Sequence, residues 1–204
     1  MNFTCELDIK YRFFTLSDIK VENSRLGYEK LVECGTAYLI NHSLPLSKIP
    51  GVRTARDLFR QLKIDPTRHR PSSEALLRRA MKEKGFYSVN NVVDVCNWCA
   101  LDFLLPNGVY DLDKIHGDIV LREGKPGESY TGLNNKPVNL AGRFCLADEK
   151  GPFGSPITDS KRTSVDLNTT NIGVIIYAPH YYDSDKLEDL ENIMVSRIKK
   201  SSEV

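Results

Sequence analysis

The chain changes character at Pro106, and this change restricts the folds open to it. Before Pro106, apolar residues mostly recur at the spacing of amphipathic helices, after a first predicted strand at 3–9. After Pro106, short runs of high β propensity alternate with Gly, Asn and Pro, and a final amphipathic helix is predicted at 185–200. Helices around a mixed, largely antiparallel sheet make the predicted fold class mixed α/β, or α+β. The other predicted helices are 25–40, 52–64, 70–85 and one from about residue 90, and the later strands are 118–123, 127–133, 136–140, 143–148 and 171–179.

Residues with known preferences for helix ends mark two of these helices. Ser72 or Ser73 is the predicted N-cap of the helix in 70–85, and Gly85 is its predicted stop. Asp183 or Ser184 is the predicted cap of the last helix.

The bulk composition indicates one globular domain over 1–204. Hydrophobic residues make up 41% and charged residues 27%, and no apolar run approaches the roughly 20 residues that span a bilayer. The N-terminal residues lack the pattern of a secretory signal, so we expect a cytoplasmic protein without a membrane role. Five cysteines in a chain of this length favour reduced thiols over a disulfide framework.

Positive charge is concentrated in one segment, although the net charge is only +1. Residues 53–84 hold ten Lys or Arg against four acids, whereas residues 85–204 hold twelve against seventeen. Such a segment either docks nucleic-acid phosphates or forms the solvated faces of two helices. The candidates for phosphate contacts are Arg53, Arg56, Arg60, Arg78 and Arg79.

The run "CNWC" invites a zinc or redox interpretation, which its context disfavours. A zinc site needs four ligands, and no second pair accompanies Cys96 and Cys99. Both cysteines lie inside a helical pattern instead of at the start of a helix, where a thiol pKa is lowered, so they are predicted core residues. We therefore expect no metal and no cofactor. Asn97 between them is either a structural clamp on a loop or a group that meets a ligand in a pocket.

Three motifs in order, "RPSSEALLRR", "KGFYSVNNVVDVCNW" and "LPNGVYDLDKIHGDIVLREGKPGE", carry a family resemblance. They resemble "PSPxWLxxRL", "INNVVDVTNYV" and "GQPMHAFDLDKI" of the B3/B4 module of the phenylalanyl-tRNA synthetase β subunit. The chain is more similar still to the free-standing B3/B4 proteins of bacteria. The match is strongest over 68–180, with 1–67 as an N-terminal extension of the same domain.

The resemblance implies a B3/B4-like fold and a proofreading role. In the synthetase this module binds the 3′ end of a tRNA that carries a wrongly attached tyrosine and hydrolyses the ester. The implied partner is therefore tRNA or an aminoacyl-tRNA 3′ end. Asn97 matches an asparagine that lines the editing pocket, Cys96 replaces its threonine neighbour, and Gly108 and Val109 belong to the same expected pocket.

The departures from the motifs matter as much as the matches. Gly108 aligns on the histidine of "PMHAFD", and Lys161 falls near the glutamate that reads the tyrosine hydroxyl. Tyrosine-specific editing therefore does not simply transfer, and no catalytic residue is assigned. Residues 158–164, "TDSKRTS", stand where that glutamate would be. They bring Asp159, Ser160, Arg162 and Thr163 to the expected pocket, with Arg70 as a second arginine at its edge.

Arg162 with its flanking hydroxyls is suited to a carboxylate or phosphate through forked hydrogen bonds. The alternative for this loop is a set of side chains that brace each other, and for Arg70 a solvated position at a helix start.

Three functional hypotheses follow. The first is a protein that binds tRNA or RNA and recognises an aminoacyl ester, with hydrolysis of mischarged tRNA in trans. The second is a non-catalytic module that binds an amino-acid-like or carboxylate ligand in the former editing pocket. The third, a thiol redox protein, ranks well behind. The sequence has no recognisable synthetase core, so we do not expect it to ligate an amino acid by itself.

Overall fold

A three-stranded antiparallel sheet forms the middle layer of the computed structural model, which describes residues 1–41 and 45–202. Its strand order is β2-β9-β3, with β2 at Ile9–Leu16, β9 at Ile172–Pro179 and β3 at Asn107–Asp111. The central strand β9 pairs with β2 along its full length and with β3 over five residues.

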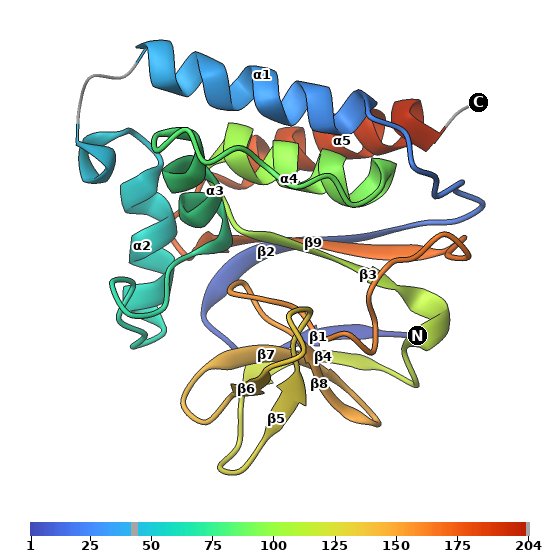
Figure 1. Ribbon diagram of the computed structural model, residues 1–204. Helices are drawn as coiled ribbons and strands as arrows, with labels where there is room; N and C mark the ends of the chain where they lie inside the picture. Colours follow the sequence, from blue (N-terminus) through green and yellow to red (C-terminus); the bar gives the residue numbers. More distant parts are fainter. Residues whose placement is uncertain (42–44, 203–204) are drawn as a thin grey trace.

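Helices cover one face of this sheet (Figure 1). Helices α4 and α5 lie next to the strands, and α1 packs on the outer side of α4. Helix α3 contacts α4 and α1, and α2 covers one end of β9. The helices are α1 at Leu26–Asn41, α2 at Val52–Gln61, α3 at Ser72–Ala80, α4 at Asn91–Phe103 and α5 at Ser184–Ser202, with short 3-10 turns η1 at Leu46–Lys48 and η2 at Leu112–Lys114.

A second sheet lies on the opposite side of the middle layer (Figure 1). Its order is β1-β4-β7-β8; β1 and β4 are parallel, and the other pairs are antiparallel. A separate two-stranded ladder, β5-β6, packs beside β8. The strands are β1 at Phe3–Cys5, β4 at Ile119–Glu123, β5 at Ser129–Thr131, β6 at Pro137–Asn139, β7 at Phe144–Asp148 and β8 at Gly151–Gly154.

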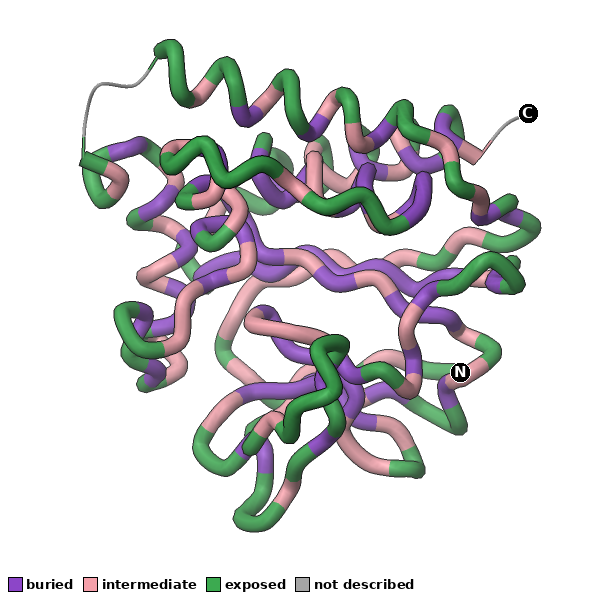
Figure 2. Tube along the Cα trace, viewed as in Figure 1, coloured by how far each residue is buried: buried purple, intermediate pink, exposed green. Residues whose placement is uncertain are grey.

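Strand β9 is buried along its whole length because both of its faces are covered (Figure 2). Successive side chains of a strand point to opposite faces. Val174 and Ile176 accordingly pack in a cluster with α4 and α5, whereas Ile175 and Tyr177 pack in a cluster with the second sheet. Two of the hydrophobic clusters in the described residues therefore share this one strand.

The mixed α/β fold class predicted from the sequence is confirmed by this architecture. The predicted strand at 3–9 is wrong in detail, because the chain turns after Cys5 and starts β2 at Ile9. The predicted serine cap of α3 is also wrong: Pro71 is the N-cap, and no side-chain cap hydrogen bond forms there. The Asp183 cap of α5 is confirmed by the 2.8 Å bond from the backbone N–H of Lys186 to its carboxylate.

Across 1–41 and 45–202, no helix combines the length and the apolar character needed to cross a bilayer.

Candidate functional site

A cavity of about 270 Å³ opens where α3, α4, β3 and the loop 155–159 meet. Four of the ligand-binding residues predicted from the sequence line it together, Cys96, Asn97, Gly108 and Val109, and so does Asp159 from the loop that the sequence placed near the pocket. We call it the α4–β3 cavity. Its other lining residues are Ser72, Leu76, Val89, Val93, Ala100, Asn107, Leu133, Ser155, Ile157 and Thr158.

The side chain of Asn97 lines this cavity without a hydrogen-bond partner among the described residues, so its amide is available to a ligand. The structural clamps of the same helix are other residues. Asp94 accepts hydrogen bonds from Ser88 Oγ at 2.6 Å and from the backbone N–H of Val89 at 2.9 Å. Asn91 joins the backbones of Lys20, Glu22 and Ser201 through three bonds of 2.9 Å.

Asp159 places a carboxyl group in the same cavity. Its Oδ1 accepts hydrogen bonds from the Tyr110 hydroxyl at 2.6 Å and from the backbone N–H of Ser155 at 3.3 Å. Burial raises the pKa of Asp159 to about 7, although these two hydrogen bonds oppose the rise. The group therefore changes its charge near neutral pH, as catalytic acids and bases commonly do.

The loop that carries Asp159 is fixed from both sides. Tyr130 of β5 donates to the backbone carbonyl of Thr158 at 2.5 Å, and Ser155 Oγ donates to the same oxygen at 2.9 Å. After Asp159 in the chain, the backbone N–H of Lys161 donates to the carbonyl of Thr131 at 2.9 Å. The β5-β6 ladder thus holds this edge of the cavity in place.

Arg162 does not reach the α4–β3 cavity, contrary to the sequence-based expectation. Its guanidinium group donates two bonds of 2.9 Å to the Asp148 carboxylate and further bonds of 3.2 Å to the carbonyls of Lys114 and Gly151. Although burial acts to raise it, the pKa of Asp148 is lowered by these Arg162 bonds and by backbone donors. Arg162 therefore braces β7 and β8, and both of its terminal nitrogens are engaged there.

Ser160 and Thr163 are buried beside the cavity and are absent from its lining. The Ser160 hydroxyl accepts the backbone N–H of Arg162 at 3.0 Å, which is the bracing role typical of such loops. Thr163 accepts the backbone N–H of Asp111 through its carbonyl at 3.0 Å. Both residues therefore have a structural role: Ser160 holds the backbone of its own loop, and Thr163 joins that loop to β3.

The cysteine pair is buried in the helical core. The pKa of Cys96 is raised well above its usual value and that of Cys99 to about 12, in both cases mainly by burial. Thiols of this kind are poor nucleophiles and poor metal ligands at neutral pH. Among the described residues, no group of three or more His, Cys, Asp or Glu side chains is arranged to hold a metal ion.

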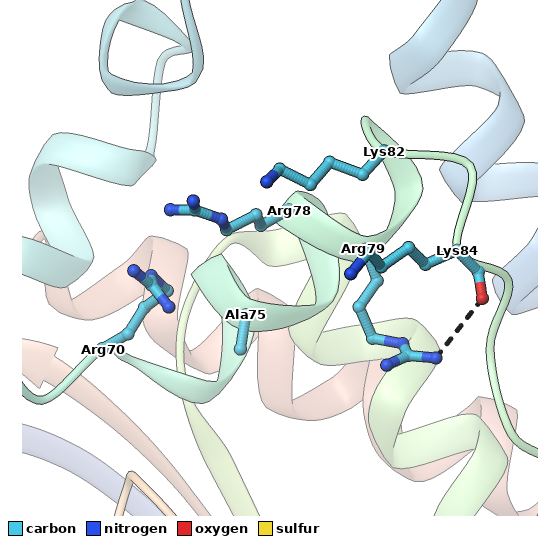
Figure 3. Close-up of a pocket in the computed structure, with 6 residues that line it drawn as sticks. All are labelled: Arg70, Ala75, Arg78, Arg79, Lys82 and Lys84. Atoms are coloured by element: carbon cyan, nitrogen blue, oxygen red, sulfur yellow. Dashed lines mark hydrogen bonds between the residues drawn. The ribbon is translucent and has the colours of Figure 1, made fainter.

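A second depression, of about 490 Å³, is lined by five cationic side chains and Ala75 (Figure 3). We call it the basic depression. Arg70, Arg78 and Lys82 extend to one side of α3, while Arg79 turns toward the backbone carbonyl of Lys84. No acid of the described residues lines it, although Arg70 Nε lies 3.4 Å from the Glu74 carboxylate. Ser72 and Leu76 of α3 face the α4–β3 cavity and Ala75 and Arg79 face the basic depression, so this helix borders both. Arg70 therefore belongs to the basic depression and not to the edge of the cavity.

The other three predicted phosphate contacts are engaged with acids. Arg56 donates two bonds of 2.7 Å to Glu74, whose side chain is 1% exposed, and so clamps α2 to α3. Arg53 and Arg60 flank Asp57 at 3.6 and 2.8 Å. Arg78 and Arg79 remain in the basic depression, and Lys82 and Lys84 join them. The prediction for Arg56 is corrected, since its charge is neutralised inside the fold.

The sequence placed Asp159 near the expected pocket with the rest of "TDSKRTS", but it assigned the ligand-binding role to Arg162 and its neighbours and none to Asp159. The signal that separates Asp159 from its neighbours is contact with Tyr110, which is 49 residues away in the sequence. Ser72, Asn107 and Ser155 were missed for the same reason, because three separate chain segments bring them to the cavity.

Comparison of the sequence with known proteins shows the family to which the chain belongs. The B3/4 domain profile matches residues 54–181. A phenylalanine–tRNA ligase beta subunit of Psychrobacter arcticus is 33% identical over 136 residues, which is 65% of this chain and 17% of that protein. The corresponding subunits of Ralstonia nicotianae and Burkholderia pseudomallei are 34% and 36% identical, over 52% and 45% of the chain and 13% and 12% of their own lengths.

The chain thus spans less than a fifth of these curated relatives. The crystal structure of an N-terminal fragment of the phenylalanyl-tRNA synthetase beta subunit from Pyrococcus horikoshii overlaps 94% of the chain and 74% of its own, with 15% identity and a TM-score of 0.44. With more than half of its residues matched by the family profile, the chain belongs to the B3/4 domain family.

Proposed function

We propose that this protein binds the aminoacylated 3′ end of a tRNA and hydrolyses the ester bond. The observation that carries the proposal is the free side-chain amide of Asn97 in the α4–β3 cavity, which the carboxyl group of Asp159 also lines. An amide N–H at this position is suited to donate to the ester carbonyl oxygen, where negative charge develops during hydrolysis. A cavity of about 270 Å³ has room for an amino-acid side chain but not for a nucleotide chain.

The charge of the cavity favours an ester over a free carboxylate. Among the described residues, its lining contains no Lys, Arg or His, and Asp159 is the one carboxyl group there. A free amino acid or other carboxylate would enter without a cationic partner and close to a group that is itself negative above neutral pH. An aminoacyl ester has no such charge. This argues against the carboxylate-binding module, which relied on Arg162 as the cationic partner.

The basic depression gives the proposed RNA ligand a place for its phosphates. Five cations line the depression, of which Arg70 is also paired with Glu74 at 3.4 Å, and such a cluster matches a phosphodiester backbone. The depression and the cavity lie on neighbouring faces of helix α3. A tRNA acceptor end in the cavity would therefore have its preceding phosphates near Arg70, Arg78 and Lys82.

The proposal is tested with tRNAs that are each charged with one of the standard amino acids. Wild-type protein should release at least one amino acid faster than the spontaneous rate, and Asn97→Ala should lower that rate at least tenfold. Asn23→Ala, at an exposed loop residue, is the matched control and should act as wild type. Hydrolysis of none of the charged tRNAs, with stabilisation of the protein by a free amino acid in a thermal-shift screen, would instead support the non-catalytic module.

The RNA part of the proposal is tested separately by the salt dependence of tRNA binding. The double variant Arg78→Ala/Lys82→Ala should weaken binding and lower the slope of log K against log salt by about 1 to 2. The control Lys125→Ala/Lys199→Ala removes the same charge from exposed positions outside the depression and should leave the slope unchanged. Equal slopes for the two double variants would contradict the assignment of the basic depression.

A further inference from the structure

The hydroxyl of Tyr110 lies between two glycines and points at Asp159. A Cβ built on Gly108 or on Gly154 would overlap this hydroxyl. Strand β3 brings Tyr110 to this position, and β8 brings Gly154 from the other side. The hydroxyl then donates to Asp159 Oδ1 at 2.6 Å. Two backbone positions are thus kept free of side chains, so that a buried tyrosine hydroxyl reaches this one carboxyl group.

The hydrogen bonds of Asp159 are unequal at its two oxygens. Oδ1 accepts from Tyr110 and from the backbone N–H of Ser155, whereas Oδ2 has no partner within the described part of the chain. A carboxyl group held by one oxygen keeps a fixed orientation and leaves the other oxygen for a water molecule or a ligand. Because Asp159 and Asn97 line the same cavity, an ester bound to the Asn97 amide would have this carboxyl group beside it.

The other titratable groups around Asp159 are neutral at pH 7. Burial raises the pKa values of Tyr110 and Tyr177 well above their usual value, and it raises those of Tyr130 and Cys96 in the same way. These four residues come from β3, β9, β5 and α4. Asp159 is therefore the one group of this cluster that changes its charge near neutrality, with a pKa of about 7.

We propose that Asp159 is the general base of the ester hydrolysis and that Tyr110 is the residue that positions it. The inference rests on the proposed function, and it adds a catalytic residue to it. Asp159 Oδ2 takes a proton from a water molecule, and the water oxygen forms a bond to the ester carbonyl carbon. The bond between that carbon and the ribose oxygen then breaks, and the ribose oxygen takes the proton back from Asp159. The products are a free amino acid and a tRNA with a free 3′ hydroxyl, and no redox partner is required.

The probe for the test is the set of 3′-O-aminoacyl-adenosine esters, which lack the phosphates of tRNA. For the best substrate among them, kcat of wild type should rise with pH up to about 7 and then level off. Asp159→Asn keeps an oxygen that can accept from Tyr110 and Ser155, but it cannot take a proton. We expect it to lower kcat about 100-fold or more while KM stays within threefold.

Tyr110→Phe gives a readout that a purely structural role would not. The Tyr110 hydrogen bond holds the pKa of Asp159 down, against the effect of burial. Its removal should move the midpoint of the kcat profile to higher pH. A midpoint that does not move would overturn the positioning role of Tyr110.

The possible failures are distinguishable. Normal kcat in Asp159→Asn, or a raised KM with unchanged kcat, would overturn the general base and leave the hydrolase function intact. If wild type hydrolyses none of the esters and none of the charged tRNAs, the proposed function fails and the catalytic role of Asp159 fails with it. Circular dichroism of Asp159→Asn and Tyr110→Phe confirms that each variant is folded before its rates are compared.

Discussion

The hydroxyl of Tyr110 occupies the space that a side chain at Gly108 would need. The two residues are two positions apart on β3, so their side-chain directions share a face of the strand. Gly108 aligns on the histidine of the synthetase motif "PMHAFD" that this stretch resembles. In this chain, only a glycine at position 108 leaves room for the Tyr110 hydroxyl that bonds to Asp159. The polar group at this place is thus the tyrosine hydroxyl and not a histidine.

The first prediction concerns this pair. Gly108→Ala should destabilise the fold by about 1 to 3 kcal/mol, because the added methyl group overlaps the Tyr110 ring and hydroxyl. In a Tyr110→Phe background the same change should cost less, since the hydroxyl is gone. Urea denaturation of the two single variants and the double variant gives the coupling energy. Additive effects would show that the two side chains do not compete for this space.

A second prediction separates structural from functional arginines. Arg162→Ala should destabilise the fold by about 3 to 5 kcal/mol at pH 7, because the Asp148 side chain is 0% exposed and loses its charged partner. Arg53→Ala is the matched control: its side chain is 86% exposed, and the change should cost less than about 1 kcal/mol. The measurement is urea denaturation of both variants.

The pH dependence of the Arg162 variant has a definite sign. The pKa of Asp148 is lowered in the folded state, so its contribution is present above the unfolded pKa of about 3.9 and is lost as pH falls through the folded value. The difference between wild type and Arg162→Ala should therefore shrink on acidification. A stable Arg162→Ala protein with impaired ligand binding would instead support the ligand role that the sequence suggested.

The third prediction compares two asparagines of α4. Asn91→Ala removes three hydrogen bonds of 2.9 Å from a residue with no exposed surface and leaves their backbone partners unsatisfied. Its cost should be on the order of 3 kcal/mol or more. Asn97→Ala removes no internal bond, and its effect on stability should stay within about 0.5 kcal/mol. Thermal unfolding of both proteins checks this, and a large loss in Asn97→Ala would mean that Asn97 is a structural clamp after all.

The fourth prediction is the pH dependence of stability due to Asp159. Its pKa is about 7 in the folded protein and about 3.9 in the unfolded chain, so the folded state holds the proton more tightly. This stabilising contribution is full below pH 4, declines between pH 4 and 7 and is lost above. The melting temperature of Asp159→Asn relative to wild type should therefore rise from pH 4 to 7 and then stay constant.

Asp118→Asn is the control for this titration. Hydrogen bonds from the backbone and side chain of Asn2 lower the pKa of Asp118, so that carboxyl group is fully ionised above pH 5. The difference in melting temperature between Asp118→Asn and wild type should stay flat from pH 5 to 8.5. A flat profile for Asp159→Asn over the same range would show that Asp159 does not titrate near neutrality.

The sequence predicted the elements whose signal is local. Periodicity or composition over a few neighbouring residues was enough to predict helices α1, α2 and α4 and the fully buried strand β9. Strands β2, β3 and β8 were missed, because β2 lies against helices on one side and a sheet on the other without a simple alternation. A short strand such as β3 or β8 is defined mainly by the partner strand to which it bonds.

By itself the sequence determined the mixed α/β class, the family and the presence of Asn97 and Gly108 in one stretch, because these depend on residues that are close in the chain. The tertiary structure decided the roles of the charged and polar groups. Arg162 pairs with Asp148 instead of a ligand, Arg56 with Glu74 instead of a phosphate, and Asp159 with Tyr110. Each pairing joins residues at least 14 positions apart, and the charge state of a buried group depends on its neighbours in space, which sequence spacing does not specify.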